Sequence, residues 1–427
     1  MRNGPGEAVV RRNRLRTLRR ALVGVGLLAL PLTSPAQTAA TVAPLALDSA
    51  VAQALRTSPL VRQASEGVRE QTALRRASFS LINPGVIVEN PGNGFFTVGG
   101  QQTFEFPTVY TRQARLARAQ VTLAEQSGAL ARNAVRREAR LAYLDLQIAE
   151  ARLRQLQTQD SLTRALAAVS ERLFAAGEVN ALQRVSTQAE ARQATNRVAQ
   201  AQADRAAARQ RLALLLNRTN TPPLQTGTDL TQPAATPLTD TIRFVALGDG
   251  VDTVAVGRNP ALAVAAEAVR VGELNRRLTR ARALPGLTVG YLNQGLRDAP
   301  FPDRLQGGLS LPLYFWQYRA QNRAAEARLR AAQAGQAATT LDTRRELAQA
   351  AADTRKFAAA LRYYAQAGLP QAAIITRTAQ RLFGAGDVSY YVLIQSLQQA
   401  ARIRADYLDA VRGYRQALIQ LDFLQGQ

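Results

Sequence analysis

The chain has 427 residues and a formal net charge of +23, and it contains neither cysteine nor histidine. The missing residue types exclude thiol nucleophiles, disulfides, Cys/His zinc sites and imidazole acid–base chemistry, and no paired-carboxylate signature stands out. The arginines are scattered among glutamate, glutamine and alanine, which is typical of a solvated helix surface and not of a nucleic-acid-binding motif. We therefore predict no enzyme activity, no metal or cofactor, and no nucleic-acid partner.

The N-terminus has the pattern of a signal peptide. Arginines in residues 11–20 form a positive segment, and an apolar run over residues 21–32 follows. Ser34-Pro35-Ala36 offers small residues for cleavage before Gln37. The apolar run of about a dozen residues is shorter than the roughly 20 that a spanning helix needs, although a retained membrane anchor is the alternative. We predict that residues 1–36 are removed on export.

The first helix is expected from Leu47 to about Leu81, with an interruption near Ser58-Pro59 and with Asp48 as its N-cap. Asn83-Pro84-Gly85 ends this helix, because proline and glycine disfavour its continuation.

Two extended segments follow, joined by a glycine- and asparagine-rich turn over residues 90–94. The first covers residues 86–89, and the second ends at residues 103–106 before Pro107. Alternation of side chains directs one apolar set to a common face (Val86, Val88, Phe104, Phe106) and a polar set to the other (Glu89, Thr103, Glu105).

A very long helix is predicted from about Thr108 to Phe174. Its apolar residues recur at spacings of 3 and 4, which indicates a coiled-coil seam (Leu141, Leu144, Ile148, Leu162, Leu166, Val169, Leu173). At 1.5 Å per residue, roughly 65 residues make a rod of about 100 Å, which no compact domain can hold. The helix is expected to end at Gly177 and to be followed by a second helix from about Val179 to Leu216, forming an antiparallel hairpin.

The second half repeats this order after a linker, residues 217–250, that is rich in proline, threonine and aspartate. A helix is expected at about residues 251–283 and extended segments at 287–293 and 305–311, with residues 295–303 between them. One face of these segments carries the apolar residues (Leu287, Val289, Tyr291, Leu309, Leu311). A long helix at about residues 313–383 and a second helix at 388–424 complete the chain.

Four landmarks indicate a tandem duplication. Arg172–Val179 (RLFAAGEV) returns 209 residues later as Arg381–Val388 (RLFGAGDV). Ser58-Pro59 matches Asn259-Pro260 and Pro84-Gly85 matches Pro285-Gly286, each after 201 residues, and Phe106-Pro107 matches Leu311-Pro312 after 205. We predict a first repeat over residues 37–216 and a second over 251–427. Each has the order α-β-β-α-α, with its strands at the end opposite the glycine turn.

Four short strands cannot close a membrane barrel, and an open sheet edge cannot lie in lipid. Three copies would pool twelve strands, within the size range of membrane β-barrels, together with twelve columns of helix. We therefore predict a mainly α fold with a small β portion, assembled as a homotrimeric α-barrel on a shared twelve-stranded β-barrel. A small soluble sheet that caps a helical rod is the alternative.

These features together resemble the outer-membrane factor (TolC-like) family of bacterial efflux and secretion channels. The resemblance covers essentially the mature chain. It rests on the duplicated order, on Gly308–Leu313 (GLSLPL) before the long helix, and on Phe-x-x-Gly tips followed by leucine- and glutamine-rich helices (Val179–Gln188, Val388–Gln399). It implies a trimer with a barrel in the bacterial outer membrane and a helical tunnel in the periplasm, of the metal- and drug-efflux type. The tunnel would dock a periplasmic adaptor joined to an inner-membrane pump.

The resemblance also implies site residues. The tip residues would dock the adaptor (Phe174, Ala176, Gly177, Glu178, Phe383, Ala385, Gly386, Asp387), and the apolar strand residues Val86, Val88, Phe104, Phe106, Leu287, Val289, Tyr291, Leu309 and Leu311 would face outer-membrane lipid. The chain departs from the best-known members in having an acid after each tip glycine. The positions that match the family's polar aperture latch hold Phe383, Val388, Val392 and Gln395, so most of that latch is missing.

The leading hypothesis is therefore a passive trimeric exit duct for small molecules or ions, which performs no chemistry of its own. The alternative is a periplasmic structural coiled-coil protein without a pore. No residue pattern specifies the cargo, whether metal, drug or protein, or the identity of the adaptor and the pump.

Overall fold

The computed structural model describes residues 45–79, 81–89, 97–218, 224–227, 230–231, 258–293 and 304–427. Every feature below belongs to the compact unit of residues 42–427. The predicted signal peptide (1–36), the predicted turns at 90–94 and 295–303, and most of the predicted linker (217–250) lie outside the described residues.

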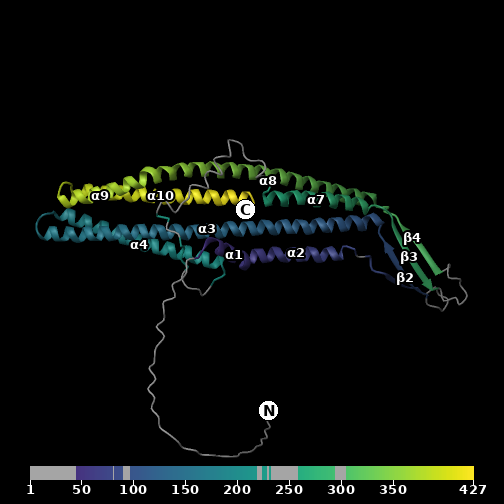
Figure 1. Ribbon diagram of the computed structural model, residues 1–427. Helices are drawn as coiled ribbons and strands as arrows, with labels where there is room; N and C mark the ends of the chain where they lie inside the picture. Colours follow the sequence, from purple (N-terminus) through teal and green to yellow (C-terminus); the bar gives the residue numbers. More distant parts are fainter. Residues whose placement is uncertain are drawn as a thin grey trace, which may run out of the picture. The chain divides into compact units, whose positions relative to one another are not determined.

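The α-β-β-α-α order occurs twice. The first set comprises α1 (Leu47–Thr57), α2 (Pro59–Ala77), β1 (Gly85–Glu89), β2 (Thr97–Phe104), α3 (Pro107–Ala175) and α4 (Ala181–Leu215). The second comprises α7 (Pro260–Ala281), β3 (Gly286–Asn293), β4 (Leu305–Ser310), α8 (Phe315–Tyr363), the π-helical turn η4 (Tyr364–Gly368), α9 (Leu369–Ala385) and α10 (Tyr390–Leu424). The strands lie at one end and both hairpin turns at the other, as the sequence predicts (Figure 1).

Two helix starts differ from the prediction. Asp48 is not the N-cap of α1: Ala46 is, without a side-chain hydrogen bond. The chain stays extended up to that point because the Leu45 amide donates to the Gln225 carbonyl at 2.9 Å. The helix predicted from residue 251 begins at Pro260, because a proline at the first helical position favours an extended residue before it, here Asn259.

The long helix predicted over residues 313–383 is present, but the π-helical turn η4 interrupts its α-helical hydrogen bonding. Pro370 follows this turn and has no amide hydrogen to donate to the carbonyl one helical turn earlier, so the regular bonding pattern is broken there. Gly368 makes the wider turn possible: a Cβ at this position would lie 2.8 Å from Cδ1 of Tyr364. The equivalent helix of the first repeat, α3, runs unbroken for 69 residues.

The helices form four parallel columns (Figure 1). α2, α1 and α4 follow one another along one side of α3, while α7 and α10 follow one another along its other side. The α8–η4–α9 column packs mainly against α7 and α10. The four columns make one layer, whose two edges are the α2–α1–α4 column and the α8–η4–α9 column. Each repeat pairs one long helix with two shorter ones, as predicted.

The four strands make one antiparallel sheet in the order β1-β2-β3-β4. Directly opposed residues of antiparallel strands point to the same face. The pairs Val86–Gly100, Gly100–Tyr291 and Tyr291–Leu305 therefore trace a single face across the sheet. β1 and β4 are its edges, so the strand order matches the column order α2, α3, α7, α8.

The main hydrophobic core lies midway along the columns, between α3 and α10. Leu408, Val411 and Tyr414 of α10 pack with Leu144 and Ile148 of α3, all almost fully buried. Each such side chain contributes about 1.5–3 kcal/mol by leaving water. Among the described residues, no helix combines the length and apolar character needed to cross a membrane.

Part of the predicted linker belongs to this core. Leu230 is fully buried in the α3–α10 cluster, and Leu224 is buried against α1, α3 and α4. Between them, the Thr226 hydroxyl donates a hydrogen bond to the buried Glu150 carboxylate. The described linker residues thus fasten the first repeat to the second across α3. Two isolated leucines in a polar segment carry no periodic signal, so the composition indicated only a linker.

Candidate functional site

Both hairpin tips contain the same backbone turn. In the first, Gly177 donates to Phe174 O at 3.0 Å and Glu178 donates to Leu173 O at 2.9 Å. In the second, Gly386 donates to Phe383 O at 3.1 Å and Asp387 donates to Leu382 O at 2.9 Å. These paired bonds define a Schellman motif, which satisfies the last carbonyls of the incoming helix.

The tip glycines are required by backbone conformation. Gly177 has φ +77° and Gly386 has φ +81°, the left-handed region that other residues enter only with strain. Nothing lies within 4 Å of a Cβ built at either position, so no contact within the chain excludes a side chain there. The other predicted docking residues of the tips differ in exposure. Four are exposed (Ala176, Glu178, Ala385, Asp387), whereas Phe174 and Phe383 are partly buried beneath the turns.

Polar side chains pack the first tip. The Arg184 guanidinium lies over the Phe174 ring, 4.2 Å from its centroid. Gln188 donates to Oε2 of Glu171 at 2.8 Å, and Arg184 lies 3.6 Å from Oε1 of the same carboxylate. Asn180 starts α4 as a true N-cap, accepting from the Gln183 amide at 2.8 Å.

Apolar side chains pack the second tip. Leu393 is fully buried, and it clusters with Ala379, Leu397 and Phe383 and with leucines of α3. Tyr390 is 9% exposed, and its ring lies 6.4 Å from that of Phe383. Burial raises the pKa of the Tyr390 hydroxyl, and the nearby Glu190 carboxylate raises it further.

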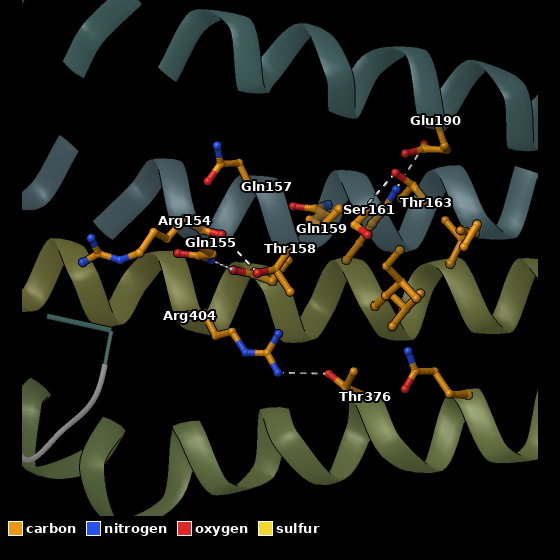
Figure 2. A pocket seen from close by; sticks show the side chains of 17 residues that line it. Arg154, Gln155, Gln157, Thr158, Gln159, Ser161, Thr163, Glu190, Thr376 and Arg404 are labelled. Atoms are coloured by element: carbon orange, nitrogen blue, oxygen red, sulfur yellow. Dashed lines mark hydrogen bonds between the residues drawn. The ribbon is translucent and has the colours of Figure 1, made fainter. Parts of the chain in front are cut away.

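A groove of about 870 Å³ separates the two hairpins above the tips, between α3 and α4 on one side and α9 and α10 on the other (Figure 2). Its wall combines polar and apolar side chains, and Arg404 donates to the Thr376 hydroxyl there at 3.3 Å. Gln398 of α10 donates to Glu190 of α4 at 3.2 Å. This contact joins the two hairpins near their tips, where the sequence indicated that the family's polar latch is missing. Glu190 carries no motif that could have identified it.

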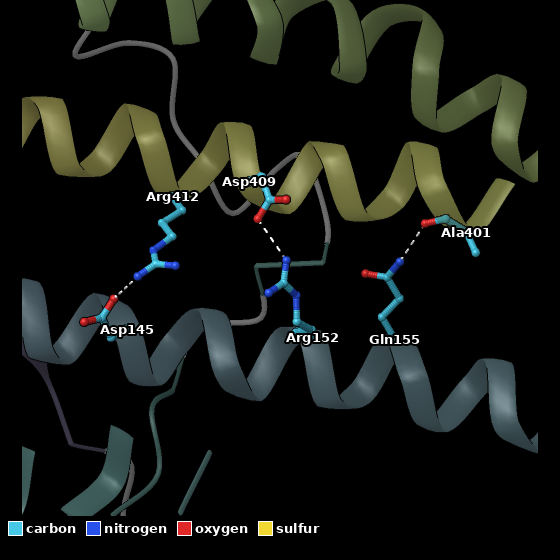
Figure 3. A network of polar contacts seen from close by, with 6 residues as sticks. All are labelled: Asp145, Arg152, Gln155, Ala401, Asp409 and Arg412. Atoms are coloured by element: carbon cyan, nitrogen blue, oxygen red, sulfur yellow. Dashed lines mark hydrogen bonds and ion pairs between the residues drawn. The ribbon is translucent and has the colours of Figure 1, made fainter. Parts of the chain in front are cut away.

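A row of polar contacts ties α3 to α10 between the core and this groove (Figure 3). Arg412 pairs with Asp145 at 2.9 Å, Arg152 pairs with Asp409 at 3.0 Å, and Gln155 donates to the Ala401 carbonyl at 3.0 Å. Each exposed ion pair contributes at most about 1 kcal/mol, so the row sets the register of the two helices more than it stabilises them. It ends at Gln155, where the groove begins.

The sheet brings together seven of the nine apolar residues singled out from the sequence. Its register puts them on one face (Val86, Val88, Phe104, Leu287, Val289, Tyr291, Leu309). Phe106 and Leu311 lie just outside the strands, because Pro107 and Pro312 end the pairing one or two residues earlier than predicted. Val86 is 77% exposed and Leu309 is 72% exposed.

The opposite face of the sheet is lined mostly by small or polar side chains, with Ile87 and Leu292 as its apolar members. Threonine and glycine predominate there (Thr97, Gly99, Thr103, Gly286, Thr288, Gly290, Gly308), and Glu89 lies on the same side. The sheet is therefore apolar on one surface and polar on the other, the pattern of a strand pair between lipid and water. In the described part of the chain, no group of His, Cys, Asp or Glu could hold a metal ion.

Comparison with known proteins finds one family model that matches the second half of the chain. Residues 253–427 match the family model described as outer membrane efflux protein. No curated protein sequence matches the chain.

Several solved structures share this fold. CusC is 18% identical, with a TM-score of 0.73 over 89% of this chain and 91% of its own. The CmeC outer membrane channel of Campylobacter jejuni is 14% identical, with a TM-score of 0.70 over 89% of this chain and 85% of its own. The outer membrane protein VceC of Vibrio cholerae is 16% identical, with a TM-score of 0.70 over 89% of this chain and 96% of its own.

Proposed function

We propose that the chain forms the passive exit duct of a tripartite efflux or type I secretion system, because residues 253–427 match the outer membrane efflux protein family model and the fold is similar to those of CusC and CmeC. Proteins of this family are outer-membrane channels that extend into the periplasm, and they are not enzymes. The duct would be a homotrimer that performs no chemistry and draws its energy from its partners.

The observation that carries this proposal is the two-faced sheet with two open edges. An apolar face of this kind is costly in water and favourable in lipid, and an edge strand in lipid must find a partner. Pairing β4 of one copy with β1 of the next satisfies both requirements, and three copies give a barrel of twelve strands. The sheet face lined by threonine and glycine would then surround the channel.

The tips are proposed to dock a periplasmic adaptor that links the duct to an inner-membrane pump. Both turns have open space around the glycine Cα, which allows another backbone to approach closely. The exposed Glu178 and Asp387 directly follow these glycines, so they would contribute to the choice of adaptor through charge complementarity. A trimer would present six such turns.

Adding bulk at one tip tests docking. Gly386→Trp should abolish export and leave trimer assembly intact, because the side chain projects into open space outside the chain. Export is measured in cells that depend on this duct, and assembly is measured by the mass of the purified protein. Normal export by an assembled Gly386→Trp variant would count strongly against docking at the tips.

Gly386→Ala is the matched control, because it introduces the same left-handed backbone strain with only a methyl group. It should export far better than Gly386→Trp. Equal loss in both variants would assign the defect to backbone strain instead of to an obstructed surface.

The second candidate, a periplasmic coiled-coil protein without a pore, is favoured by the long helices alone. It gives no reason for an apolar sheet face that is exposed on the single chain. Membrane fractionation separates the two candidates: the duct is recovered with the outer membrane, whereas a structural rod is recovered in the soluble periplasmic fraction.

A further inference from the structure

Arginine is concentrated where the helices meet the sheet (Figure 1). Four short stretches lie there: the end of α2 (75–77), the start of α3 (107–118), the end of α7 with its C-cap (276–282) and the start of α8 (315–323). Together they contain eleven arginines and no aspartate or glutamate. We call these eleven arginines the arginine collar. All four columns of the layer contribute to it.

Helix surfaces elsewhere in the chain mix both signs of charge. α10, for example, has four arginines and three aspartates in 35 residues. Such a mixture is what a solvated helix surface requires, since neighbouring opposite charges offset one another. A stretch with arginine alone is therefore not explained by the general composition of the chain.

The collar is charge that the chain leaves largely uncompensated. Nine of its eleven arginines are exposed. Two of them form ion pairs with acids outside the four stretches: Arg280 lies 2.6 Å from Glu326, and Arg282 lies 4.0 Å from Glu105. The other nine form no ion pair with the residues that the structure describes. Because like charges gathered on one surface repel, an external anion would stabilise this arrangement.

Both repeats carry collar arginines at equivalent positions. Arg75-Arg76 matches Arg276-Arg277 after 201 residues, and Arg118 matches Arg323 after 205. These are the offsets of the proline landmarks on either side of the strands. The duplication therefore has the same cations at the end of the helix before each strand pair and in the helix after it.

The two repeats pack differently at this level, so packing does not explain the shared arginines. Val109 is buried in the contact between α3 and α7 and is 1% exposed. Tyr314 matches it after 205 residues and is 64% exposed. The features common to both repeats are the positive charges, which indicates a requirement on the surface.

The collar lies directly beside the sheet whose apolar face is proposed to contact lipid. Headgroup layers add roughly 5–8 Å on each side of a hydrocarbon core of about 30 Å. Two helical turns rise about 11 Å, so the helix ends next to the sheet cross a layer of that depth. Tyr314 and Trp316 are 64% and 60% exposed at the start of α8, and these residue types are enriched at membrane–water interfaces.

Resting on the membrane location in the proposed function, we propose that the arginine collar binds the headgroups of anionic phospholipids in the periplasmic leaflet of the outer membrane. A guanidinium group donates two parallel hydrogen bonds to phosphate oxygens, and an anionic membrane surface attracts basic residues next to a membrane-spanning segment. Phosphates of the opposite leaflet lie across the hydrocarbon core and are out of reach. Since arginine enters hydrocarbon only at high cost, the collar also sets the depth of the chain in the bilayer.

Lipid selectivity tests the proposal on the unaltered protein. In phosphatidylcholine vesicles, spin-labelled phosphatidylglycerol should associate with the protein several-fold more strongly than spin-labelled phosphatidylcholine does. The fraction of motionally restricted label measures this preference. It should fall as salt is raised, because exposed charges are screened. Equal association of the two lipids at low salt would overturn the proposal.

Inorganic phosphate separates a membrane surface from a soluble phosphate ligand. At equal ionic strength, phosphate and chloride should reduce the preference for phosphatidylglycerol to the same extent. A much larger reduction by phosphate would assign the collar to a soluble phosphate compound and overturn a lipid contact.

Arg118→Gln combined with Arg323→Gln removes two equivalent exposed arginines, one from each repeat, and should remove most of the preference. Arg192→Gln combined with Arg344→Gln is the matched control. It makes the same change of charge at two exposed positions, and Arg344 lies about 40 Å along α8 from the sheet. The control should keep the full preference. Equal losses in both double variants would show an effect of net charge and contradict a local collar.

Conductance in planar bilayers distinguishes this proposal from the proposed function. Under a salt gradient, Arg118→Gln combined with Arg323→Gln should leave the reversal potential unchanged. A changed reversal potential with an unchanged lipid preference would place these arginines in the channel and overturn the collar. Conducting trimers without any preference for phosphatidylglycerol would also overturn it and leave the proposed function standing. A soluble chain that does not conduct would overturn both.

Discussion

In the first hairpin Arg184 covers the Phe174 ring, whereas in the second the equivalent residue, Leu393, is fully buried. Gln188, which binds Glu171, likewise corresponds to the buried Leu397. The backbone turns have the same hydrogen bonds, so the difference lies in the side chains. α4 belongs to an edge column and packs mainly on α3, with the Gln398–Glu190 hydrogen bond to α10, whereas α10 packs on α3, α8 and α9.

The two repeats share the turn, and their packing differs with the position of each helix in the layer. A helix with neighbours on two sides gains from leucine, because more of its surface leaves water. An edge helix keeps polar residues on surfaces that remain wet. The four predictions below test this difference.

The largest effect is expected at the buried position of the second tip. Leu393→Ala removes a fully buried side chain from the α3–α9–α10 cluster and should cost about 2–5 kcal/mol of local stability. Hydrogen exchange of the α9 and α10 amides measures this loss. If amides of the first tip exchanged equally fast in this variant, the two hairpins would not pack independently.

The shared turn predicts equal effects at both tips. Gly177→Ala and Gly386→Ala each force a side chain into the left-handed region, which costs roughly 1–2 kcal/mol. No atom lies within 4 Å of either added Cβ, so no steric clash should make the stability loss larger in one variant than in the other. Protease cleavage rates at the two turns should rise by similar factors. Clearly unequal rises would show that the two turns differ in more than side chains.

A smaller effect is expected at the polar position of the first tip. Arg184→Ala removes a cation–π contact at a partly exposed site, which is worth about 0.5–1 kcal/mol. The same exchange measurement on α3 and α4 should show a loss well below that of Leu393→Ala. A loss of equal size would contradict the distinction between an edge helix and an inner helix.

The smallest effect under ordinary conditions concerns pH. Burial raises the pKa of the Tyr390, Tyr364 and Tyr143 hydroxyls in the folded chain. Their stabilising contribution is complete below the unfolded tyrosine pKa of about 10 and is lost as pH rises above it, because the unfolded chain releases the proton first. Urea unfolding above that pH should show the loss, and Tyr390→Phe should reduce it. The first tip has Ala181 at the position equivalent to Tyr390, so this position contributes no pH dependence of stability.

The sequence predicted the elements that depend on strong periodicity or on repeated landmarks. The seam leucines of α3 indicated a helix of about 100 Å, and alternation indicated which strand residues share a face. The repeated octet located both turns, because only a few residue types favour the left-handed region that Gly177 and Gly386 adopt. Each of these signals is carried by residues near one another in the chain.

The features that sequence reasoning missed depend on tertiary contacts. Asp48 is not the N-cap, because the hydrogen bond between Leu45 and Gln225 determines where the extended chain ends and the helix begins. Leu230 gave no signal because its burial depends on α10, far along the chain. Pro370 indicates an interruption of the helix, but the helical spacing of apolar residues continues on both sides of this proline.

The central claim is that three copies make a conducting duct in the outer membrane. Reconstitution of the purified protein in planar lipid bilayers tests it most directly, with the trimer mass established on the same sample. We expect stable conductance steps from the trimer, and their loss when the chain is kept monomeric. A protein that is recovered as a soluble periplasmic rod and gives no conductance would contradict the account.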